Sequence, residues 1–291
     1  MSAEEIIAEF EQYLVNDGKA KKTLHSYLGD VKGFIQWIEG KGITFRGHFS
    51  NLHITGYKKF LMDNKYKVNT VNKKINSLQA FNHFLISTKR MDQLAANLKR
   101  DKIKIAMGSE QEIAVFSEEE VERILFYVDN SSYRNKLIIY LLLFTGLRVS
   151  ELVNIKLKDM DLLGMQLTIL GKGGKQREVP LKQEVVEAAK EYLEKERKNS
   201  KQVNSEYLLL TQRAGKMDRD AVNKLLKRMS KELGIPMYPH KYRHTFCTML
   251  IKRGVDLTTV AKLAGHAGIQ TTAKFYISTS KKDKQEAVNL L

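Results

Sequence analysis

Apolar residues recur every three or four positions through residues 1–90, which is the spacing of one face of an α-helix. The pattern predicts an all-helical domain in which short polar segments separate the helices. Gly40 and Gly42 interrupt the pattern after the second helix, and Asn69 with Thr70 is an N-cap signal for the fourth. The four predicted helices span residues 4–16, 23–37, 51–63 and 70–86.

The apolar period is lost over residues 99–112, where mixed charges surround a Gly-Ser pair, and this segment is predicted to be an exposed linker. A second domain begins at Phe116. Ser117 and Glu120 predict a capping box at the start of its first helix. A strongly apolar helix is predicted over residues 135–145.

The period changes after Arg148. Two short runs typical of β-strands flank a glycine-rich turn over residues 171–175, which predicts a small sheet inside a helical domain. Helices then resume, and Gly265 is predicted to end the last of them as its C′ residue. The strands are predicted over 166–170 and 177–181, the helices over 183–197, 218–233, 241–254 and 257–264, and a short amphipathic tail over 281–291.

These patterns predict a mainly α fold with a small antiparallel β-sheet. The expected domains are a helical one over residues 1–105, a linker over 106–115 and a second domain over 116–291.

The net charge of the chain indicates a class of binding partner. The 291 residues include 49 Lys and Arg against 33 Asp and Glu, a net charge of +16. Residues 1–110 carry 18 basic and 11 acidic side chains, and the remaining residues carry 31 and 22. Both halves of the chain are therefore basic. Lys73 and Lys74 are among the lysines expected on the surface of the first domain. A polyanion such as nucleic acid is the natural partner, and the alternative is a protein whose basic surface serves only solubility.

Other classes are disfavoured. No run approaches 18 apolar residues, so no membrane span is expected, and the first residues lack the basic leader of a secretory signal. The single cysteine, Cys247, excludes a disulfide framework and a cysteine-rich zinc site. A cytoplasmic location is expected.

Two segments present cations from turns. In Thr145-Gly146-Leu147-Arg148-Val149-Ser150-Glu151-Leu152, a glycine after an apolar helix directs Arg148 inward from a helix junction. The simpler interpretation is that Arg148 pairs with Glu151. In the turn Gly171-Lys172-Gly173-Gly174-Lys175, glycines surround Lys172 and permit a flexible tip, although such a turn is often only a turn.

Two later segments add histidines and a tyrosine. In His240-Lys241-Tyr242-Arg243-His244, His240 and Arg243 share one helix face and pair a titratable imidazole with a permanent cation. His240 and His244 also have the spacing of a metal-binding pair, but they lack the glutamate of HExxH. In the last segment, Tyr276 lies ten residues after the histidine of Leu263-Ala264-Gly265-His266, which allows the chain to fold back towards His266. The simpler interpretation is that a tyrosine at the end of a helix is structural.

Together these segments resemble the tyrosine site-specific recombinases, the phage integrase family, and are most similar to Xer-like and transposon-encoded members. The resemblance covers both domains and implies an N-terminal SAM-like core-binding domain and a C-terminal catalytic domain. It implies these catalytic residues: Arg148, Lys172, His240, Arg243, His266 and Tyr276. Compact Xer-like members usually have their tyrosine where this chain has Phe275, one residue earlier. The spacing of Tyr276 is familiar among phage and conjugative-element integrases, so Tyr276 is favoured as the nucleophile and Tyr242 is the second candidate. Ala264, where leucine is common, is expected to affect packing only.

The resemblance further implies cleavage and rejoining of DNA through a 3′-phosphotyrosyl intermediate and a Holliday junction, without metal or other cofactor. Arg148, Arg243 and His266 would bind the phosphate, His240 would act as base and Lys172 as acid. The implied partners are double-stranded DNA with an inverted-repeat core site, clamped by both domains, and further copies of the chain in a tetramer. The apolar tail would dock on a neighbouring subunit, and the alternative is that Val288, Leu290 and Leu291 pack on their own domain. The short N-terminal region favours a recombinase that resolves dimers or transposon cointegrates, or integrates and excises a mobile element. The alternatives are a type IB topoisomerase-like enzyme and a non-catalytic DNA-binding factor.

Overall fold

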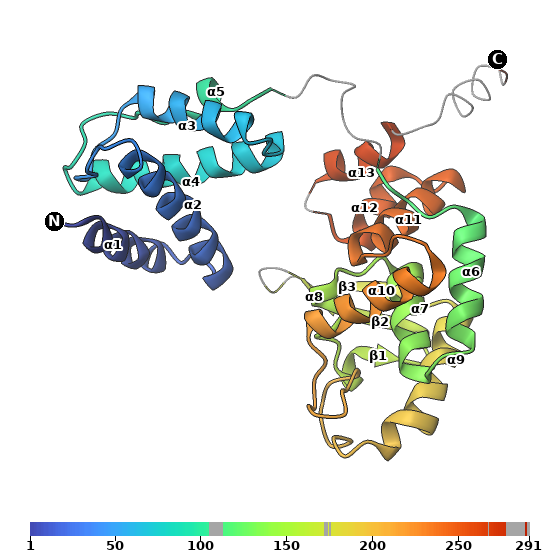
Figure 1. Cartoon of the computed structure of the whole chain (residues 1–291). Helices are drawn as coiled ribbons and strands as arrows, with labels where there is room; N and C mark the ends of the chain where they lie inside the picture. Colours follow the sequence, from blue (N-terminus) through green and yellow to red (C-terminus); the bar gives the residue numbers. More distant parts are fainter. Residues whose placement is uncertain (105–112, 172–173, 175, 267, 278–288, 290–291) are drawn as a thin grey trace. The chain divides into compact units, whose positions relative to one another are not determined.

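The computed structural model describes residues 1–104, 113–171, 174, 176–266, 268–277 and 289, and for residues 274–277 it describes the backbone alone. The chain divides into two compact units, Met1–Glu110 and Gln111–Leu291 (Figure 1). Each unit has its own hydrophobic core. Most of the predicted linker over 106–115 lies outside the described residues, so the predicted domain boundaries stay a prediction.

The first unit is helical, as its apolar period predicts. A capping box between Ser2 and Glu5 starts the first helix. Phe10 of the first helix and Phe81 of the fourth are fully buried and meet edge to face, and the buried Phe34 of the second helix meets Tyr57 of the third in the same way. The helices of this unit are α1 (Ala3–Asn16), α2 (Lys21–Glu39), α3 (Asn51–Asp63), α4 (Val68–Ser87) and α5 (Leu98–Asp101).

Two details of the first unit differ from the sequence-based expectation. The fourth helix begins at Val68 with Lys67 as its N-cap, and no side chain caps it, so the signal at Asn69 and Thr70 was misread. The predicted exposed linker begins with α5, in which the carboxylate of Asp101 is buried and accepts from the backbone amide of Asn97 at 2.7 Å. A local hydrogen bond therefore folds a segment whose composition is typical of a loop.

Lys73 and Lys74 are not simply surface cations. Asp30 of α2 is only 4% exposed. It pairs with Lys73 at 3.0 Å and Lys74 at 3.2 Å, and it accepts from the hydroxyl of Ser77 at 2.7 Å. A buried carboxylate needs such partners because water no longer solvates it. These lysines hold α4 against α2.

The second unit surrounds the apolar helix α7, which is buried over most of its length. The capping box at Ser117 and Glu120 forms as predicted. The α-helices of this unit are α6 (Glu118–Asp129), α7 (Tyr133–Thr145), α8 (Val149–Leu152), α9 (Gln183–Glu191), α10 (Arg219–Leu233), α11 (Pro239–Lys252), α12 (Leu257–Ala264) and α13 (Ile269–Ile277).

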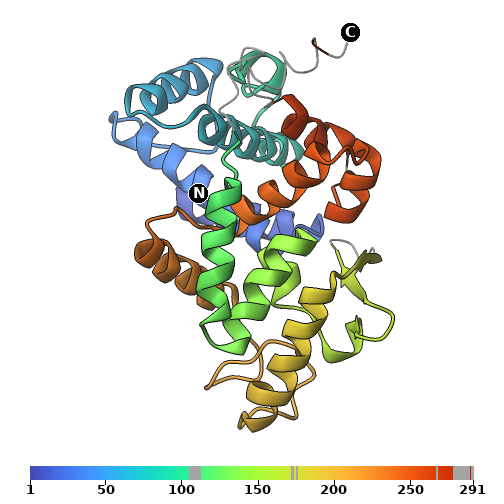
Figure 2. The same cartoon turned by 90° about the vertical axis from the view of Figure 1, so that its right-hand side faces the viewer.

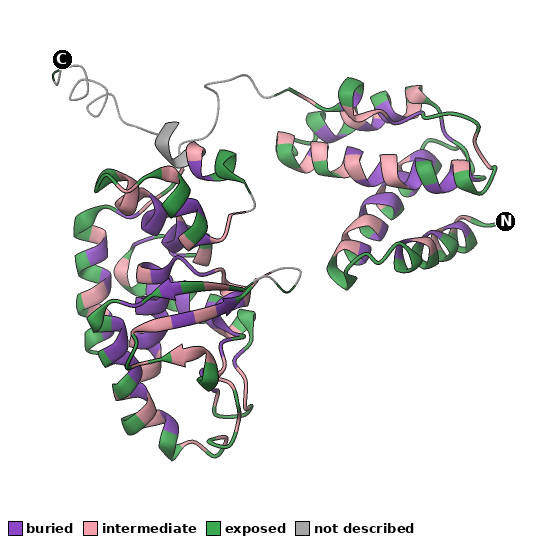
Figure 3. Cartoon of the chain, turned by 180° about the vertical axis from the view of Figure 1, so that it is seen from behind, coloured by how far each residue is buried: buried purple, intermediate pink, exposed green. Residues whose placement is uncertain are grey.

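The strands of the second unit form one antiparallel sheet in the order β1-β2-β3, with bounds Met160–Asp161, Gln166–Leu170 and Gln176–Pro180. Leu167 pairs with Val179 and Ile169 with Arg177. Figure 3 shows the strands side by side, with buried residues of β2 alternating with less buried ones, and β3 contacts α12. The predicted fold class, mainly α with a small antiparallel sheet, is confirmed.

The helix predicted over 183–197 is shorter and changes form. After α9 the chain continues as a π-helix over Tyr192–Glu196 and a 3-10 turn over Arg197–Asn199 (Figure 2). Arg197 is buried and donates to four backbone carbonyls of the following loop, those of Val203, Ser205, Tyr207 and Leu208. Hydrogen bonds from a side chain to the carbonyls of a neighbouring loop leave no periodic signal in the sequence. Across the described parts of both units, none of the helices combines the length and apolar character that crossing a bilayer requires.

Candidate active site

Arg148 stands at a sharp junction between two helices. Gly146 ends α7 in the left-handed region with φ 61°, and Arg148 is the N-cap of α8. A Cβ atom on Gly146 would lie 2.3 Å from the ring of Phe246, so the glycine is required by both conformation and space. The chain therefore turns tightly, with Leu147 buried, and delivers Arg148.

The guanidinium of Arg148 joins two segments. Its Nη1 pairs with Glu151 at 2.8 Å, as the simpler interpretation of the sequence expects. Its Nη2 donates to the carbonyl oxygen of Gly265 at 2.8 Å, more than a hundred residues away. The side chain keeps 38% of its surface exposed. Arg148 is thus held in place by protein contacts and still accessible to a ligand.

Arg177 on β3 belongs to the same network, although the sequence analysis did not single it out. It binds both carboxylate oxygens of Glu151, at 3.1 Å and 2.9 Å. Arg177 and Val179 alternate with exposed neighbours along β3. This period of two is the sequence signal from which the inward direction of Arg177 could have been predicted. Burial alone would raise the pKa of Glu151, but hydrogen bonds from Arg177 and Arg148 outweigh it and lower that pKa.

Arg243 approaches the same junction from α11. Pro239 occupies the first turn of this helix, and Arg243 lies one turn further on, 3% exposed. Its Nη1 donates to the carbonyl of Gly146 at 2.7 Å. Its Nη2 is buried and has no hydrogen-bond partner among the described residues. Burial and the charge of Arg148 lower the pKa of Arg243 to about 10, which leaves it cationic at neutral pH.

His240 lies one turn before Arg243 on the same helix and is exposed. Partial burial of the ring and the nearby charges of Arg243 and Arg148 lower the pKa of His240. Lowering the pKa of an imidazole favours its neutral form, which accepts a proton. The predicted pairing of a titratable imidazole with a permanent cation on one helix face is thus present.

His266 follows directly on the end of α12. Gly265 closes that helix in the left-handed region with φ 67°, as the sequence predicts. The Nδ1 atom of His266 lies 2.8 Å from the hydroxyl oxygen of the buried Thr272 in α13. Burial and the guanidiniums of Arg243, Arg148 and Arg177 lower the pKa of His266 to about 4. The ring is therefore neutral at physiological pH.

The structure describes the two remaining predicted residues, Tyr276 and Lys172, only in part. The backbone of Tyr276 is in α13, which contacts α11 and α12, the helices that carry Arg243 and precede His266. The side chains of Tyr276 and Phe275 and all of Lys172 lie outside the described residues. Four of the six predicted residues are thus gathered at one place, and helix α13 runs beside them.

Tyr242, the second candidate for the nucleophile, is in a different environment. It is fully buried, its ring packs against Phe116 and its hydroxyl donates to the sulfur of Met237 at 3.4 Å. Burial raises its pKa well above that of a free phenol. Such a hydroxyl is a poor nucleophile.

The rings of His240 and His244 lie 6.1 Å apart. In the described part of the chain, no group of three or more His, Cys, Asp or Glu side chains has the arrangement of a metal site. The pair therefore has no complete ligand set among these residues.

Comparison with known families agrees with this geometry. Residues 114–283 match the model of the "Phage integrase family", and residues 6–89 match "Phage integrase, N-terminal SAM-like domain". The TnP I resolvase of Bacillus thuringiensis is 33% identical over 272 residues, 92% of this chain and 93% of that protein. The tyrosine recombinase XerA of Thermococcus kodakarensis is also 33% identical, over 92% of this chain and 89% of the relative.

Solved structures share the fold. The XerH site-specific recombinase bound to palindromic difH substrate has a TM-score of 0.77 and 21% identity, covering 91% of this chain and 79% of that chain. The Tn1549 transposon integrase in complex with transposon right end DNA has a TM-score of 0.74 and 19% identity, covering 98% of each chain. The family models match both domains, and the relatives are similar over nearly the whole chain. The chain therefore belongs to the phage integrase family, as a Xer-like tyrosine recombinase.

Proposed function

We propose that this tyrosine recombinase cleaves duplex DNA by a metal-independent transesterification in which the phenolic oxygen of Tyr276 attacks the scissile phosphorus. The observation that carries the proposal is the convergence of Arg148, Arg243, His240 and His266 from three separate segments of the second unit. Two guanidiniums beside two imidazoles held neutral suit a pentacoordinate phosphate, which is more negative at its oxygens than the ground state.

Arg148 and Arg243 bind the non-bridging oxygens in this proposal. The Nη2 of Arg243 is a buried donor that finds no acceptor among the described residues, and such an atom normally has one. A phosphate oxygen supplies that acceptor. Charge-assisted bonds of this kind stabilise the developing charge, which is the work of a metal ion in other phosphoryl-transfer enzymes.

The histidines have separate roles. Neutral His266 donates an N–H to the phosphate. Neutral His240 takes the proton of the Tyr276 hydroxyl, since a phenol with a pKa near 10 is mostly protonated at pH 7. Lys172 gives a proton to the leaving 5′-oxygen. One P–O bond forms as another breaks, so the 3′-phosphotyrosyl bond keeps the linkage for religation and no ATP is consumed.

The substrate of this proposal is double-stranded DNA with an inverted-repeat core site. Both halves of the chain are basic, which suits phosphate contacts from each domain. Structural neighbours were solved with palindromic difH, with transposon right end DNA and with a lambda integrase core site. A DNA substrate also suits a cytoplasmic location.

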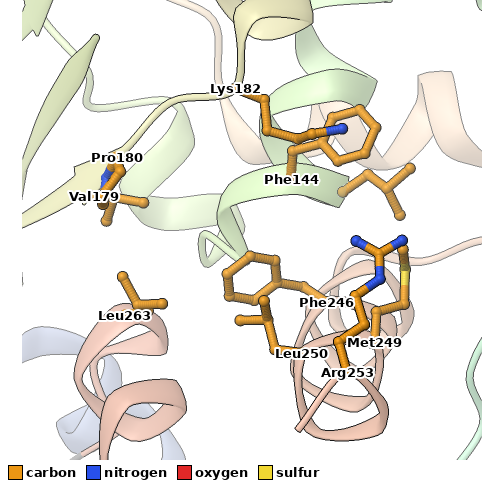
Figure 4. A pocket seen from close by; sticks show the side chains of 10 residues that line it. Phe144, Val179, Pro180, Lys182, Phe246, Met249, Leu250, Arg253 and Leu263 are labelled. Atoms are coloured by element: carbon orange, nitrogen blue, oxygen red, sulfur yellow. The ribbon is translucent and has the colours of Figure 1, made fainter. Parts of the chain in front are cut away.

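Strand exchange through a Holliday junction needs four active sites, so a tetramer on DNA is part of the proposal. The second unit has an apolar cavity of about 230 Å³ into which Phe144, Phe246, Leu250 and Leu263 converge (Figure 4). The tail of the sequence ends in Leu290 and Leu291, and an apolar tail of a neighbouring subunit is the proposed occupant. Phe246 lines the cavity and also packs against Gly146, so the occupant would contact the active-site framework.

The biological role favoured by the relatives is resolution of DNA dimers or transposon cointegrates, because one of them is named a resolvase. Integration and excision of a mobile element use the same chemistry.

The test is covalent trapping. A binding selection from random duplexes supplies the site, which is then built as a nicked suicide substrate. Wild type and Tyr242→Phe should form a covalent adduct. Tyr276→Phe should bind the DNA with the same Kd and form none, because its ring has no hydroxyl. Peptide mapping of the trapped wild-type adduct identifies the attached residue directly.

An adduct on another residue, or residual trapping by Tyr276→Phe, would move the nucleophile elsewhere. Relaxation of plasmids that lack the selected site, without recombinants, would indicate topoisomerase activity. No adduct from wild type would indicate a DNA-binding factor.

A further inference from the structure

Arg177 connects three segments that surround the active site, and the mechanism above leaves it without a role. From β3, its Nε donates to the carbonyl of Leu263 at 3.0 Å, near the end of α12. Its Nη1 and Nη2 donate to the two carboxylate oxygens of Glu151 at 3.1 Å and 2.9 Å. Its side chain is only 14% exposed. All three nitrogens already have partners, in contrast to the Nη2 atom of Arg243.

The bond to Glu151 controls the orientation of Arg148. Glu151 is 6% exposed, and burial alone favours its protonated form. Arg177 supplies the largest of the contributions that keep it ionised. As a carboxylate it accepts from both the Nη1 and the backbone amide of Arg148, at 2.8 Å and 2.9 Å. Without Arg177, the anchor of Arg148 becomes a buried carboxylate with half of its partners.

The bond to Leu263 controls the end of α12. Arg177 lies so close to Gly265 that a Cβ there would be 2.7 Å from its Nη1. The carbonyl of the same glycine accepts from Arg148, and His266 is the next residue. Arg177 therefore contacts both the segment that orients Arg148 and the segment that presents His266.

We propose that Arg177 is a positioning residue for DNA cleavage: it binds no phosphate itself, and it places Arg148 and His266 against the phosphate by holding Glu151 and the end of α12. The inference rests on the proposed function, because its readout is the cleavage reaction of Tyr276. Displacement of catalytic groups by about 1 Å can reduce a rate on the order of a hundredfold.

The experiment compares single-turnover cleavage with DNA binding on the nicked substrate. Arg177→Gln should lower the cleavage rate about a hundredfold and leave the Kd for DNA within about threefold of wild type, since Arg177 makes no DNA contact. Arg123→Gln is the matched control. Arg123 also donates to a carbonyl near a helix end, that of Leu233 in α10, and it has no link to the cluster. Its cleavage rate and Kd should both stay at wild-type values.

A double-mutant cycle tests the route through Glu151. If the two residues act as one unit, Arg177→Gln combined with Glu151→Gln should cleave no more than about threefold slower than the slower single variant. Arg177→Lys keeps the positive charge but loses the planar guanidinium that binds both oxygens of Glu151. Its cleavage rate should therefore lie between those of Arg177→Gln and wild type. If Arg177→Gln does not fold, as judged by thermal melting, Arg177→Lys replaces it in the cycle.

Three results would overturn the inference: an unchanged cleavage rate, equal losses of binding and cleavage, or losses that multiply in the double variant. These results differ from a failure of the proposed function, in which wild type itself forms no adduct through Tyr276.

Discussion

His266 and Arg243 show how crowded cations alter individual side chains. Burial of His266 opposes its protonation, and three nearby guanidiniums add to the effect. The imidazole is therefore a neutral hydrogen-bond donor at the pH of the cell, while Arg243 stays charged in spite of a lowered pKa. The same guanidiniums that are proposed to bind an anionic phosphate disfavour a positive charge on the histidine.

The pKa of His266 predicts a pH dependence of stability. Its folded value of about 4 is below the ordinary 6.5, so the unfolded chain binds more protons as pH falls from 6.5 towards 4, and stability is lost across that window. After a discount for solvent screening, we expect a contribution of about 1 kcal/mol between pH 7 and pH 5. Urea unfolding at both pH values should show a smaller pH difference in His266→Asn than in wild type.

The exposed His25 of the first unit provides the control for this measurement. His25→Asn should keep the wild-type pH difference. A pH difference in His266→Asn equal to that of wild type would contradict the account of His266.

At the scale of elements, two helices end where the site begins. Gly146 ends α7 two residues before Arg148, and Gly265 ends α12 one residue before His266. Both adopt a left-handed conformation, and a side chain packs where a Cβ would be: Phe246 at Gly146 and Arg177 at Gly265. A helix end positions a side chain more rigidly than a long loop does, because the helix fixes the direction of the chain.

Gly146→Ala is expected to destabilise the second unit by roughly 2–4 kcal/mol, of which about 1 kcal/mol is the cost of the left-handed conformation and the rest is the clash with Phe246. Gly234→Ala at the end of α10 is the matched control, since Gly234 has φ 68° and nothing within 4 Å of a Cβ. Denaturant unfolding should show that this control loses only about 1 kcal/mol of its free energy of unfolding. Equal losses in the two variants would show that the contact with Phe246 contributes nothing.

At the scale of the whole molecule, the basic charge of the two units and the apolar cavity of the second unit suit different interactions. The positive charge of both units suits DNA binding by a single chain. The cavity lined by Phe144, Phe246, Leu250 and Leu263 suits contact with another copy. Binding and assembly should therefore be separable by mutation.

Removal of residues 281–291 is expected to leave binding to a half-site unchanged, within about threefold in Kd, because the proposed DNA contacts remain. Assembly of four subunits on paired sites should be lost, as measured by analytical ultracentrifugation. Leu250→Asp, which places a charge in the cavity of the full-length chain, should have the same effect. Intact tetramers of the truncated chain would remove the tail from the proposal.

Much of this protein follows from local sequence signals. The helix starting at the Ser117 capping box and the helix ending at Gly265 agree with the structure, because caps and turns depend on neighbouring residues. The errors arise where a polar side chain bonds to the backbone and does not pack on a periodic face. Arg197 donates to four carbonyls of the loop that follows it, and Asp101 accepts from the backbone of its own turn. Neither kind of bond leaves a periodic pattern in the sequence.

The sequence by itself determined the mainly helical fold with its small sheet, the family, and the identity of Arg148, His240, Arg243 and His266 as site candidates, because periodicity and motif spacing are properties of the chain order. Only the tertiary structure decided that Arg177 and Glu151 join them, that His266 is neutral and that one nitrogen of Arg243 has no partner in the part of the chain that the structure describes. Those properties depend on burial and on contacts between segments as distant as β3 and the end of α12, which chain order does not encode locally.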